Sequence, residues 1–258
     1  MKIVLLGHED LASVFALRLL MSLAPQHDYV VFFSGPLASD ASLSQALVEL
    51  AAVDRQLLQR FTDSYRLPDA LRTAGSLPAP NSPEGLATLA AAKPDLLVSI
   101  RYRRILQDAA IALPAQGVLN LHSGILPDYK GVMVTFWAML NAEPEIGCTL
   151  HRINDGGIDT GPVVAIERRK CDFTKSYLEN VLALYPRGCD MVARAIGEIS
   201  RNRSIGTRQF ATRAGHYFST PDKEVIDRYL QKSLYLTTGA EWQTLQELSA
   251  AHKKSPGA

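Results

Sequence analysis

The sequence predicts an α/β fold in which a mostly parallel sheet is flanked by helices and followed by a small C-terminal extension. Three observations lead to this prediction. Short apolar runs end at glycine or polar residues, which is typical of strands buried in a parallel sheet. Stretches with a helical spacing of apolar residues alternate with these runs. After about residue 203 the composition turns polar and the alternation stops.

The first part of the chain shows the alternation clearly. Residues 2–6 (KIVLL) form an apolar run that ends at Gly7, so we expect a buried strand there. Residues 10–23 predict a helix with Asp10 as its N-cap, and residues 28–34 repeat the strand pattern. A strand, a helix and a second strand at this spacing indicate a βαβ unit.

The same pattern continues to about residue 200. Residues 41–61 predict a helix whose apolar stripe is formed by Leu43, Leu47, Leu50 and Val53. A long helix is predicted over 174–200, with Thr174 as its N-cap. The other expected elements are helices over 84–92, 132–141 and 222–234, and strands over 95–100, 117–124, 148–154 and 163–169. We therefore predict one domain over residues 1–203 and an extension over 204–258, whose last residues are expected to be disordered.

Composition and charge exclude several classes of protein. The 258 residues are 47% hydrophobic and 21% charged, which argues against a disordered chain, and the net charge of +1 supplies no field that would attract nucleic acid or an anionic membrane. The three cysteines are widely spaced, which argues against a disulfide framework and a zinc site, so no metal is expected. No apolar run is long enough for a signal peptide or a membrane span. We expect a soluble, cytoplasmic protein with no nucleic-acid or membrane partner.

Two polar residues interrupt the apolar strand predicted over 117–124. Asn120 and His122 are two positions apart, so their side chains point to the same face, near the carboxyl end of the strand. Ligands bind at this edge of open α/β sheets. The loop that follows contains Gly124, Pro127 and Gly131, which favour a tight turn beside both side chains. The alternative is that both residues only satisfy a turn at the strand end.

A second polar stretch, INDGGIDTGP, follows the strand predicted over 148–154. A helix and a strand separate it from His122, which would return the chain to the same end of the sheet. Taken alone, this stretch reads as a turn loop rich in aspartate and glycine. Together with Asn120 and His122, this stretch offers the carboxylates of Asp159 and Asp155 as candidates for a third residue.

The three stretches NLHSGILPDYKG, GCTLH (147–151) and DGGIDTGP (155–162) resemble the formyltransferases that use 10-formyltetrahydrofolate. That family has an Asn-x-His strand, a loop with Leu-Pro and Gly, a Gly-x-Thr-x-His strand and an Asp-Gly loop in this order. The resemblance covers roughly residues 1–200. It implies a Rossmann-like catalytic domain with Asn120, His122 and Asp159 as catalytic residues. Asp159 is the match to the family's aspartate because it stands in the terminal Asp-Thr-Gly, and Asp155 is the fallback.

The resemblance also implies a formyl donor and a site for it. The donor co-substrate is 10-formyltetrahydrofolate, whose pterin is held largely by backbone groups of two segments. In this chain they would be Arg103, Arg104, Ile105 and Leu106, and Asn154, Asp155, Gly156 and Gly157. A solvated loop is the alternative for the two arginines. His151 is expected to be mainly structural.

The chemistry explains why these residue types occur together. When an amine attacks the formyl carbon, the carbonyl oxygen of the tetrahedral intermediate becomes negative, and Asn120 can donate an amide N–H to it. A protonated His122 would donate a second hydrogen bond. Asp159 can stabilise the imidazolium or relay the proton that leaves the amine.

The acceptor is expected to be the amine of a small metabolite, such as a nucleotide-linked amino sugar or a hydroxyornithine. The loop GHEDLAS lacks a glycine-rich phosphate cradle, and the extension is short and not strongly basic, which argues against glycinamide ribonucleotide and tRNA. The segment 215–229 could cover the acceptor or pack on the surface. A homodimer is compatible with the sequence. The alternatives are a 10-formyltetrahydrofolate hydrolase and a non-catalytic Rossmann-like binding module.

Overall fold

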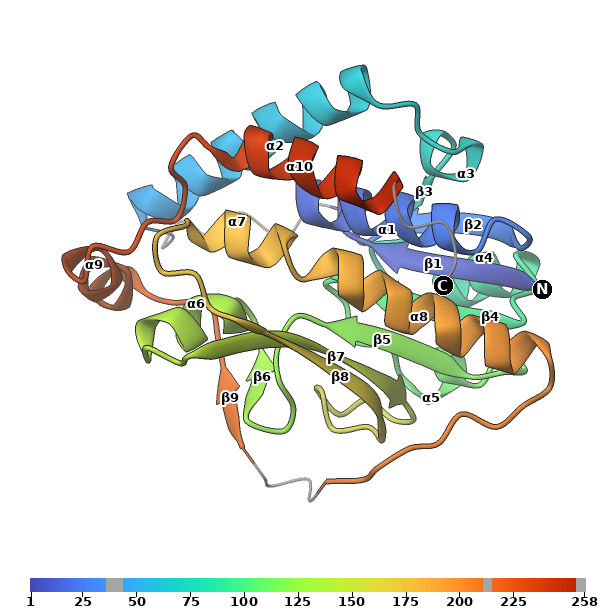
Figure 1. Cartoon of the computed structure of the whole chain (residues 1–258). Coiled ribbons are helices and arrows are strands. Elements are labelled where there is room, and N and C mark those ends of the chain that lie inside the picture. The colour runs from blue at the N-terminus through green and yellow to red at the C-terminus, as the bar shows by residue number, and fades with distance from the viewer. Residues whose placement is uncertain (36–43, 211–214, 254–258) are drawn as a thin grey trace.

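A seven-stranded sheet forms the centre of the molecule in the computed structural model, which describes residues 1–35, 44–210 and 215–253 (Figure 1). The strand order is β3-β2-β1-β4-β5-β7-β8. The first five strands in this order are parallel, and β7 and β8 are antiparallel to their neighbours. The predicted mostly parallel α/β class is therefore confirmed. The strands are β1 (Lys2–Gly7), β2 (Asp28–Phe33), β3 (Gly75–Ser76), β4 (Leu96–Ile100), β5 (Val118–His122), β7 (Glu145–Ile153) and β8 (Val163–Lys170).

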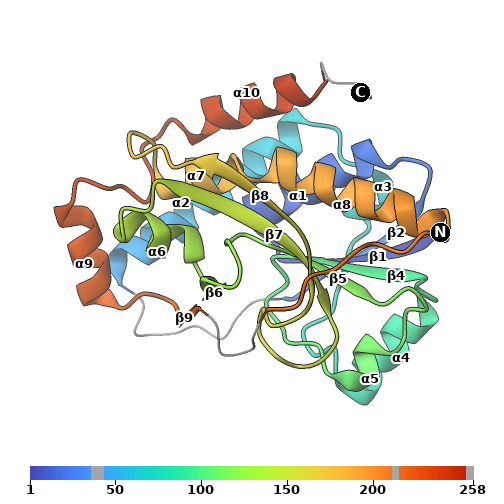
Figure 2. The same ribbon diagram turned by 60° about the horizontal axis from the view of Figure 1, so that its bottom comes forward.

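Helices cover both faces of this sheet (Figure 2). Ile3 and Leu5 of β1 pack into the core on the side of α1 and α8, whereas Val4 and Leu6 pack on the side of α4 and α5. A central strand that is buried on both faces must be apolar throughout, which explains the run KIVLL. The helices are α1 (Leu11–Leu23), α2 (Gln45–Ser64), α3 (Asp69–Arg72), α4 (Pro83–Ala91), α5 (Asp108–Ile111), α6 (Val134–Leu140), α7 (Tyr177–Leu182), α8 (Tyr185–Ser200), α9 (Lys223–Gln231) and α10 (Glu241–Lys253).

A second, two-stranded sheet lies beside the main one. Its strands are β6 (Tyr129–Gly131), in the loop after β5, and β9 (His216–Phe218), in the C-terminal extension. They run parallel to each other, and Figure 1 shows β9 alongside β6. The small sheet therefore joins the extension to the loop that follows Asn120 and His122.

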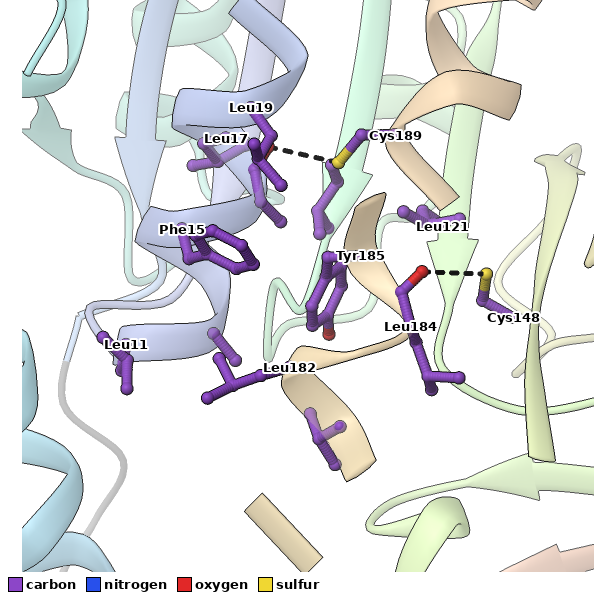
Figure 3. Close-up of a cluster of buried hydrophobic side chains, with 14 of the residues drawn as sticks. Leu11, Phe15, Leu17, Leu19, Leu121, Cys148, Leu182, Leu184, Tyr185 and Cys189 are labelled. Atoms are coloured by element: carbon purple, nitrogen blue, oxygen red, sulfur yellow. Dashed lines mark hydrogen bonds between the residues drawn. The ribbon is translucent and has the colours of Figure 1, made fainter. Parts of the chain in front are cut away.

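The larger core lies between the sheet and the pair α1 and α8 (Figure 3). Phe15, Tyr185 and Cys189 are fully buried there, and the Cys189 Sγ lies 3.2 Å from the Ala16 carbonyl oxygen. Burial of each large apolar side chain contributes about 1.5–3 kcal/mol. All three cysteines are buried and free, in agreement with the prediction that they form no disulfide framework.

The long helix predicted over 174–200 is wrong in two respects. The chain forms two helices, α7 and α8, because Pro186 has no N–H to continue a helical ladder from α7. The N-cap is Ser176, which forms a capping box with Glu179. Thr174 instead hydrogen-bonds the carboxylate of Asp172.

Helix α10 is a feature that the sequence analysis missed. It packs against α7, with Leu245 fully buried, and a network of carboxylates and hydroxyls joins the two helices. Ser176 Oγ donates to Glu241 Oε1 at 2.8 Å, and Thr244 Oγ1 donates to Glu179 Oε1 at 2.7 Å. The helix was overlooked because much of its buried face is polar. Leu43 of the predicted stripe and the predicted disordered residues 254–258 lie outside the described residues.

The extension shares the core of the rest of the chain. Ile226, Tyr229 and Leu245 belong to the same buried cluster as the sheet and helix α1. The boundary at residue 203 stays a prediction. Over the ranges that the structure describes, no helix combines the length and apolar character needed to cross a membrane.

Asp10 connects the start of α1 to the end of β4. Its side chain caps α1 by accepting a hydrogen bond from the Ser13 N–H at 2.8 Å, as predicted for an N-cap. Arg101 and Arg103 donate to the same carboxylate at 2.9 and 3.2 Å. Burial alone would raise the pKa of Asp10, but the two arginines lower it to about 2. Asp10 is therefore a buried carboxylate that depends on its cationic partners.

Replacing Arg101 should destabilise the fold. In Arg101→Met, the buried carboxylate of Asp10 keeps only Arg103 as its cationic partner, and we expect the free energy of unfolding to fall by about 3 kcal/mol. Urea denaturation followed by circular dichroism measures this loss. The control is Arg72→Met, which removes an exposed ion pair with Asp69 and should leave the unfolding curve essentially unchanged. Equal curves for the two variants would contradict the structural role of Arg101.

Candidate active site

Asn120 and His122 lie on the same face of β5, at its carboxyl end, as the two-residue spacing predicts. The neighbouring strand β7 is antiparallel, and its register places His151 opposite Asn120. The Asn120 Nδ2 and His151 Nε2 atoms are 3.0 Å apart, so the amide and the imidazole are hydrogen-bonded across the two strands.

Asp159 reaches the same place from the loop that follows β7. Its Oδ1 lies 3.4 Å from His122 Nδ1 and 3.5 Å from His151 Nε2, and its Oδ2 accepts the Gly131 backbone N–H at 2.8 Å. Asn120, His151, Asp159 and His122 thus form one continuous chain of contacts. Asp155, the fallback, is exposed and accepts a hydrogen bond from Gly157 instead.

The backbone at Asp159 is strained. Its φ of +52° lies in the left-handed region, which a residue with a Cβ adopts at a cost. The contacts of the carboxylate with two imidazoles and one N–H compensate for this cost. Strain of this kind gathers at functional sites, because the surrounding structure must hold a reactive group in one orientation.

The hydrogen bonds define which ring nitrogens carry protons. His122 Nε2 is 2.7 Å from the Tyr129 carbonyl oxygen, which can only accept, so Nε2 carries a proton. His151 Nδ1 donates in the same way to the Arg152 carbonyl at 2.9 Å, and its Nε2 faces both the Asn120 amide and the Asp159 carboxylate. His122 Nδ1 then faces the Asp159 Oδ1 atom at 3.4 Å.

The electrostatics of Asp159 follow from these neighbours. Burial alone would raise the pKa of this carboxyl group, but the charge of His122, the hydrogen bond and charge of His151, and the Gly131 N–H together lower it to about 2. Asp159 is therefore a carboxylate at any pH near neutrality. Since it is ionised and buried, it can stabilise a positive charge on either imidazole.

The cluster is closed from solvent in this structure. The side chains of His122 and Asp159 are only 7% and 9% exposed. A cavity of about 10 Å³ lies beside Asp159, with room for about one water molecule, and its lining includes Pro127, Lys130 and Phe210. In such a poorly solvated place, hydrogen bonds to a developing charge are stronger than in water.

The two segments predicted to hold the pterin lie against each other. A Cβ placed on Gly156 would be 3.8 Å from the Leu106 carbonyl oxygen, and residues 154–157 are exposed. The Ile105 side chain is half exposed, while its carbonyl oxygen accepts a hydrogen bond from Asn81. Exposed backbone beside an exposed apolar side chain fits a flat heterocycle with polar edges. That role stays a prediction for Arg103, Arg104, Ile105, Leu106, Asn154, Asp155, Gly156 and Gly157.

Two parts of the site were not anticipated. His151 contacts both Asn120 and Asp159, whereas we expected a mainly structural residue from the sequence. Its contact with Asn120 follows from the antiparallel register of β5 and β7. The backbone of β6 contacts His122 through Tyr129 and Asp159 through Gly131. In the sequence, only the glycines of this loop indicated that the β6 backbone lies close to the site. A Cβ on Gly124 would collide with His122 Nε2 and the Tyr129 carbonyl oxygen.

The histidines and carboxylates of the site are not arranged as a metal centre. Within residues 1–35, 44–210 and 215–253, no group of three or more His, Cys, Asp or Glu side chains could hold a metal ion. The arrangement instead offers hydrogen-bond donors and one carboxylate, which suits acid–base and oxyanion chemistry.

The segment that holds this site is similar to known proteins. Residues 75–182 match the family model described as formyl transferase. Among curated proteins, the methionyl-tRNA formyltransferase of Xanthomonas campestris is 32% identical over 171 residues, which are 65% of this chain and 49% of that protein. The chain spans about half or less of the length of the curated relatives it matches.

Solved structures show the same fold at low sequence identity. A sugar N-formyltransferase from a Shewanella species is 15% identical, with a TM-score of 0.58 over 85% of this chain and 76% of that one. An N-formyltransferase from Helicobacter canadensis, crystallised with folinic acid and dTDP-3-aminofucose, is 19% identical, with a TM-score of 0.51 over 85% of this chain and 71% of that one. The residues 75–182 that match the formyl transferase family model include Asn120, His122, His151 and Asp159.

Proposed function

We propose that this protein transfers a formyl group from 10-formyltetrahydrofolate to the amine of a small metabolite. The observation that carries the proposal is the chain of contacts from Asn120 through His151 and Asp159 to His122, at the carboxyl edge of the sheet. It lies within the segment that matches the formyl transferase family. A binding module would need no strained, buried carboxylate between two imidazoles.

The donor would supply an activated one-carbon unit, the formyl group on its N10 nitrogen. In the reaction a bond forms between the acceptor nitrogen and the formyl carbon, and the bond to N10 breaks. Asn120 would donate an amide N–H to the formyl oxygen as negative charge develops there. The hydrogen bond between the Asn120 amide and His151 Nε2 holds the amide in orientation.

His122 and Asp159 would manage charge and protons. The Asp159 carboxylate lies 3.4 Å from His122 Nδ1, and the other ring nitrogen, Nε2, carries the proton that this ring would donate to the developing oxyanion. In this structure the Nε2–H of His122 is bonded to the Tyr129 carbonyl, and donation to the oxyanion would exchange that bond. The Asp159 carboxylate can also take up the proton that leaves the attacking amine. That proton finally passes to N10.

The comparisons support an acceptor class. Neighbours that share the fold over 85% of this chain include two sugar N-formyltransferases and an N-formyltransferase crystallised with dTDP-3-aminofucose. A nucleotide-linked amino sugar is therefore our first candidate, with a hydroxyornithine-type amine as the second. Methionyl-tRNA is a competing acceptor, because the curated relatives carry that name.

One assay can separate these acceptors. The protein is incubated with 10-formyltetrahydrofolate and, separately, a dTDP-linked amino sugar, N5-hydroxyornithine, methionyl-tRNA or no amine, and the products are analysed by mass spectrometry. We expect one small amine to gain one carbonyl unit while tetrahydrofolate is released. If only methionyl-tRNA gained a carbonyl unit, the proposal of a small acceptor would be overturned. Formate released in the absence of an amine would indicate a hydrolase.

Asn120 and His122 can be tested directly. Asn120→Ala removes an oxyanion donor, and we expect kcat to fall about 10²–10³-fold, with a comparable loss for His122→Ala. Circular dichroism should show that both variants fold. His27→Ala is the control, because His27 precedes β2 at the opposite edge of the sheet and should keep full activity. Near wild-type turnover in either site variant would contradict the assigned roles.

The ionisation of Asp159 predicts a difference in acid stability. Its pKa of about 2 lies below the ordinary value, so the carboxylate stabilises the fold above pH 4 and this contribution, about 2 kcal/mol, is lost as the pH falls towards 2. Asp159→Asn tolerates the left-handed backbone but has no such carboxylate. Urea unfolding between pH 5 and pH 2 should therefore show a steeper loss for the wild type than for the variant. Parallel curves would contradict a buried, ionised Asp159.

A further inference from the structure

Strand β6 contacts two ionisable residues of the site, His122 and Asp159, through its backbone. The Tyr129 carbonyl accepts the Nε2–H of His122 at 2.7 Å, and the Gly131 N–H donates to Asp159 Oδ2 at 2.8 Å. These two hydrogen bonds orient the imidazole and the carboxylate relative to each other. The position of β6 therefore decides the geometry of the catalytic pair.

Strand β9 of the extension holds β6 in register. Tyr129, Lys130 and Gly131 pair with His216, Tyr217 and Phe218. The His216 N–H donates to the Asp128 carbonyl at 3.0 Å, and the Val132 N–H donates to the Phe218 carbonyl at 2.8 Å. A Cβ on Gly131 would collide with that Phe218 carbonyl, so the close approach of the strands requires a glycine there.

An aromatic stack secures this short pairing. The ring of Phe218 lies between those of Tyr129 and Trp137, with centroids 5.2 and 5.1 Å away and interplanar angles of 13° and 29°. Trp137 also donates its Nε1–H to the Ser219 carbonyl at 3.0 Å. Two three-residue strands form few hydrogen bonds and are not stable by themselves. The stack, at about 0.5–1.5 kcal/mol for each ring pair, supplies the missing stabilisation.

We propose that Phe218 is a positioning residue for the catalytic pair, acting through β6. This inference rests on the proposed formyl transfer and gives the C-terminal extension a role in turnover. It differs from the expectation that segment 215–229 covers the acceptor. A cover would act on acceptor binding and hence on KM, whereas displacement of Tyr129 and Gly131 disturbs His122 and Asp159 and hence acts on kcat.

Point variants are the appropriate test. Truncation after residue 203 would remove Tyr229 and Leu245 from the core and unfold the protein. Phe218→Ala removes the middle ring of the stack, and Phe218→Tyr keeps it. Tyr235→Ala is the matched control, since it removes an aromatic ring of the same extension that is 55% exposed.

The first measurement reports on the hydrogen bond of His122 and does not depend on enzymatic activity. In protein labelled with ¹⁵N-histidine, the Nε2–H of His122 should give a protected imidazole signal, assigned by its absence in His122→Gln. We expect this signal to shift and exchange faster with water in Phe218→Ala, and to stay unchanged in Phe218→Tyr and Tyr235→Ala. An unchanged signal in Phe218→Ala would overturn the proposal, even if no formyl acceptor had been found.

The second measurement uses the acceptor found by the mass-shift assay. In Phe218→Ala we expect kcat to fall about tenfold or more, while the KM for the amine stays within about twofold. Phe218→Tyr should recover most of the turnover, and Tyr235→Ala should match the wild type. A raised KM with normal kcat would show that the extension covers the acceptor and would overturn the positioning role.

Discussion

The buried carboxylate of Asp159 is the interaction on which the site depends. A negative charge with so little access to water is stable only when cations and N–H donors surround it. Here two imidazoles and the N–H of Gly131 fill that role, and each comes from a different element. The strained backbone of Asp159, the cross-strand position of His151 and the close approach of β6 are all consequences of bringing these groups to one point.

The mixed sheet makes this convergence possible. Strand β5 ends at the carboxyl edge with His122, where open α/β sheets bind their ligands. Because β7 runs antiparallel to β5, it places His151 beside Asn120 and then releases the Asp-Gly loop next to the segment predicted to hold the pterin. In this register the end of β7 lies beside the start of β5, with Ile153 opposite Val118, and the loop to β8 brings Asp159 back to His122. The antiparallel pair thus brings the Asp-Gly loop and the candidate catalytic residues together within one short stretch of chain.

Much of the fold was predictable, because local patterns determine it. The apolar runs of β1, β2, β4 and β5 and the cap at Asp10 follow from periodicity and side-chain chemistry. Pro186 was the overlooked signal for the break between α7 and α8. Helix α10 escaped because hydroxyls and carboxylates form much of its contact with α7.

The site was predictable only in part. The alternation of side chains along a strand brings Asn120 and His122 together, but Asp159 was preferred over Asp155 through a family resemblance. The contact of His151 depends on strand register, which one sequence does not determine. Strands β6 and β9 have three residues each and no periodicity of their own, so their pairing is visible only in three dimensions.

The pairing of β6 with β9 also bears on the order in which the molecule matures. The hydrogen bond from Trp137 to Ser219 joins residues 82 positions apart, and contacts of such long separation form late because a large loop must first close. During synthesis on the ribosome, Asn120, His122 and Asp159 emerge well before β9 does. A nascent chain that ends before β9 would hold these three side chains yet lack the strand that, on our proposal, aligns them for turnover.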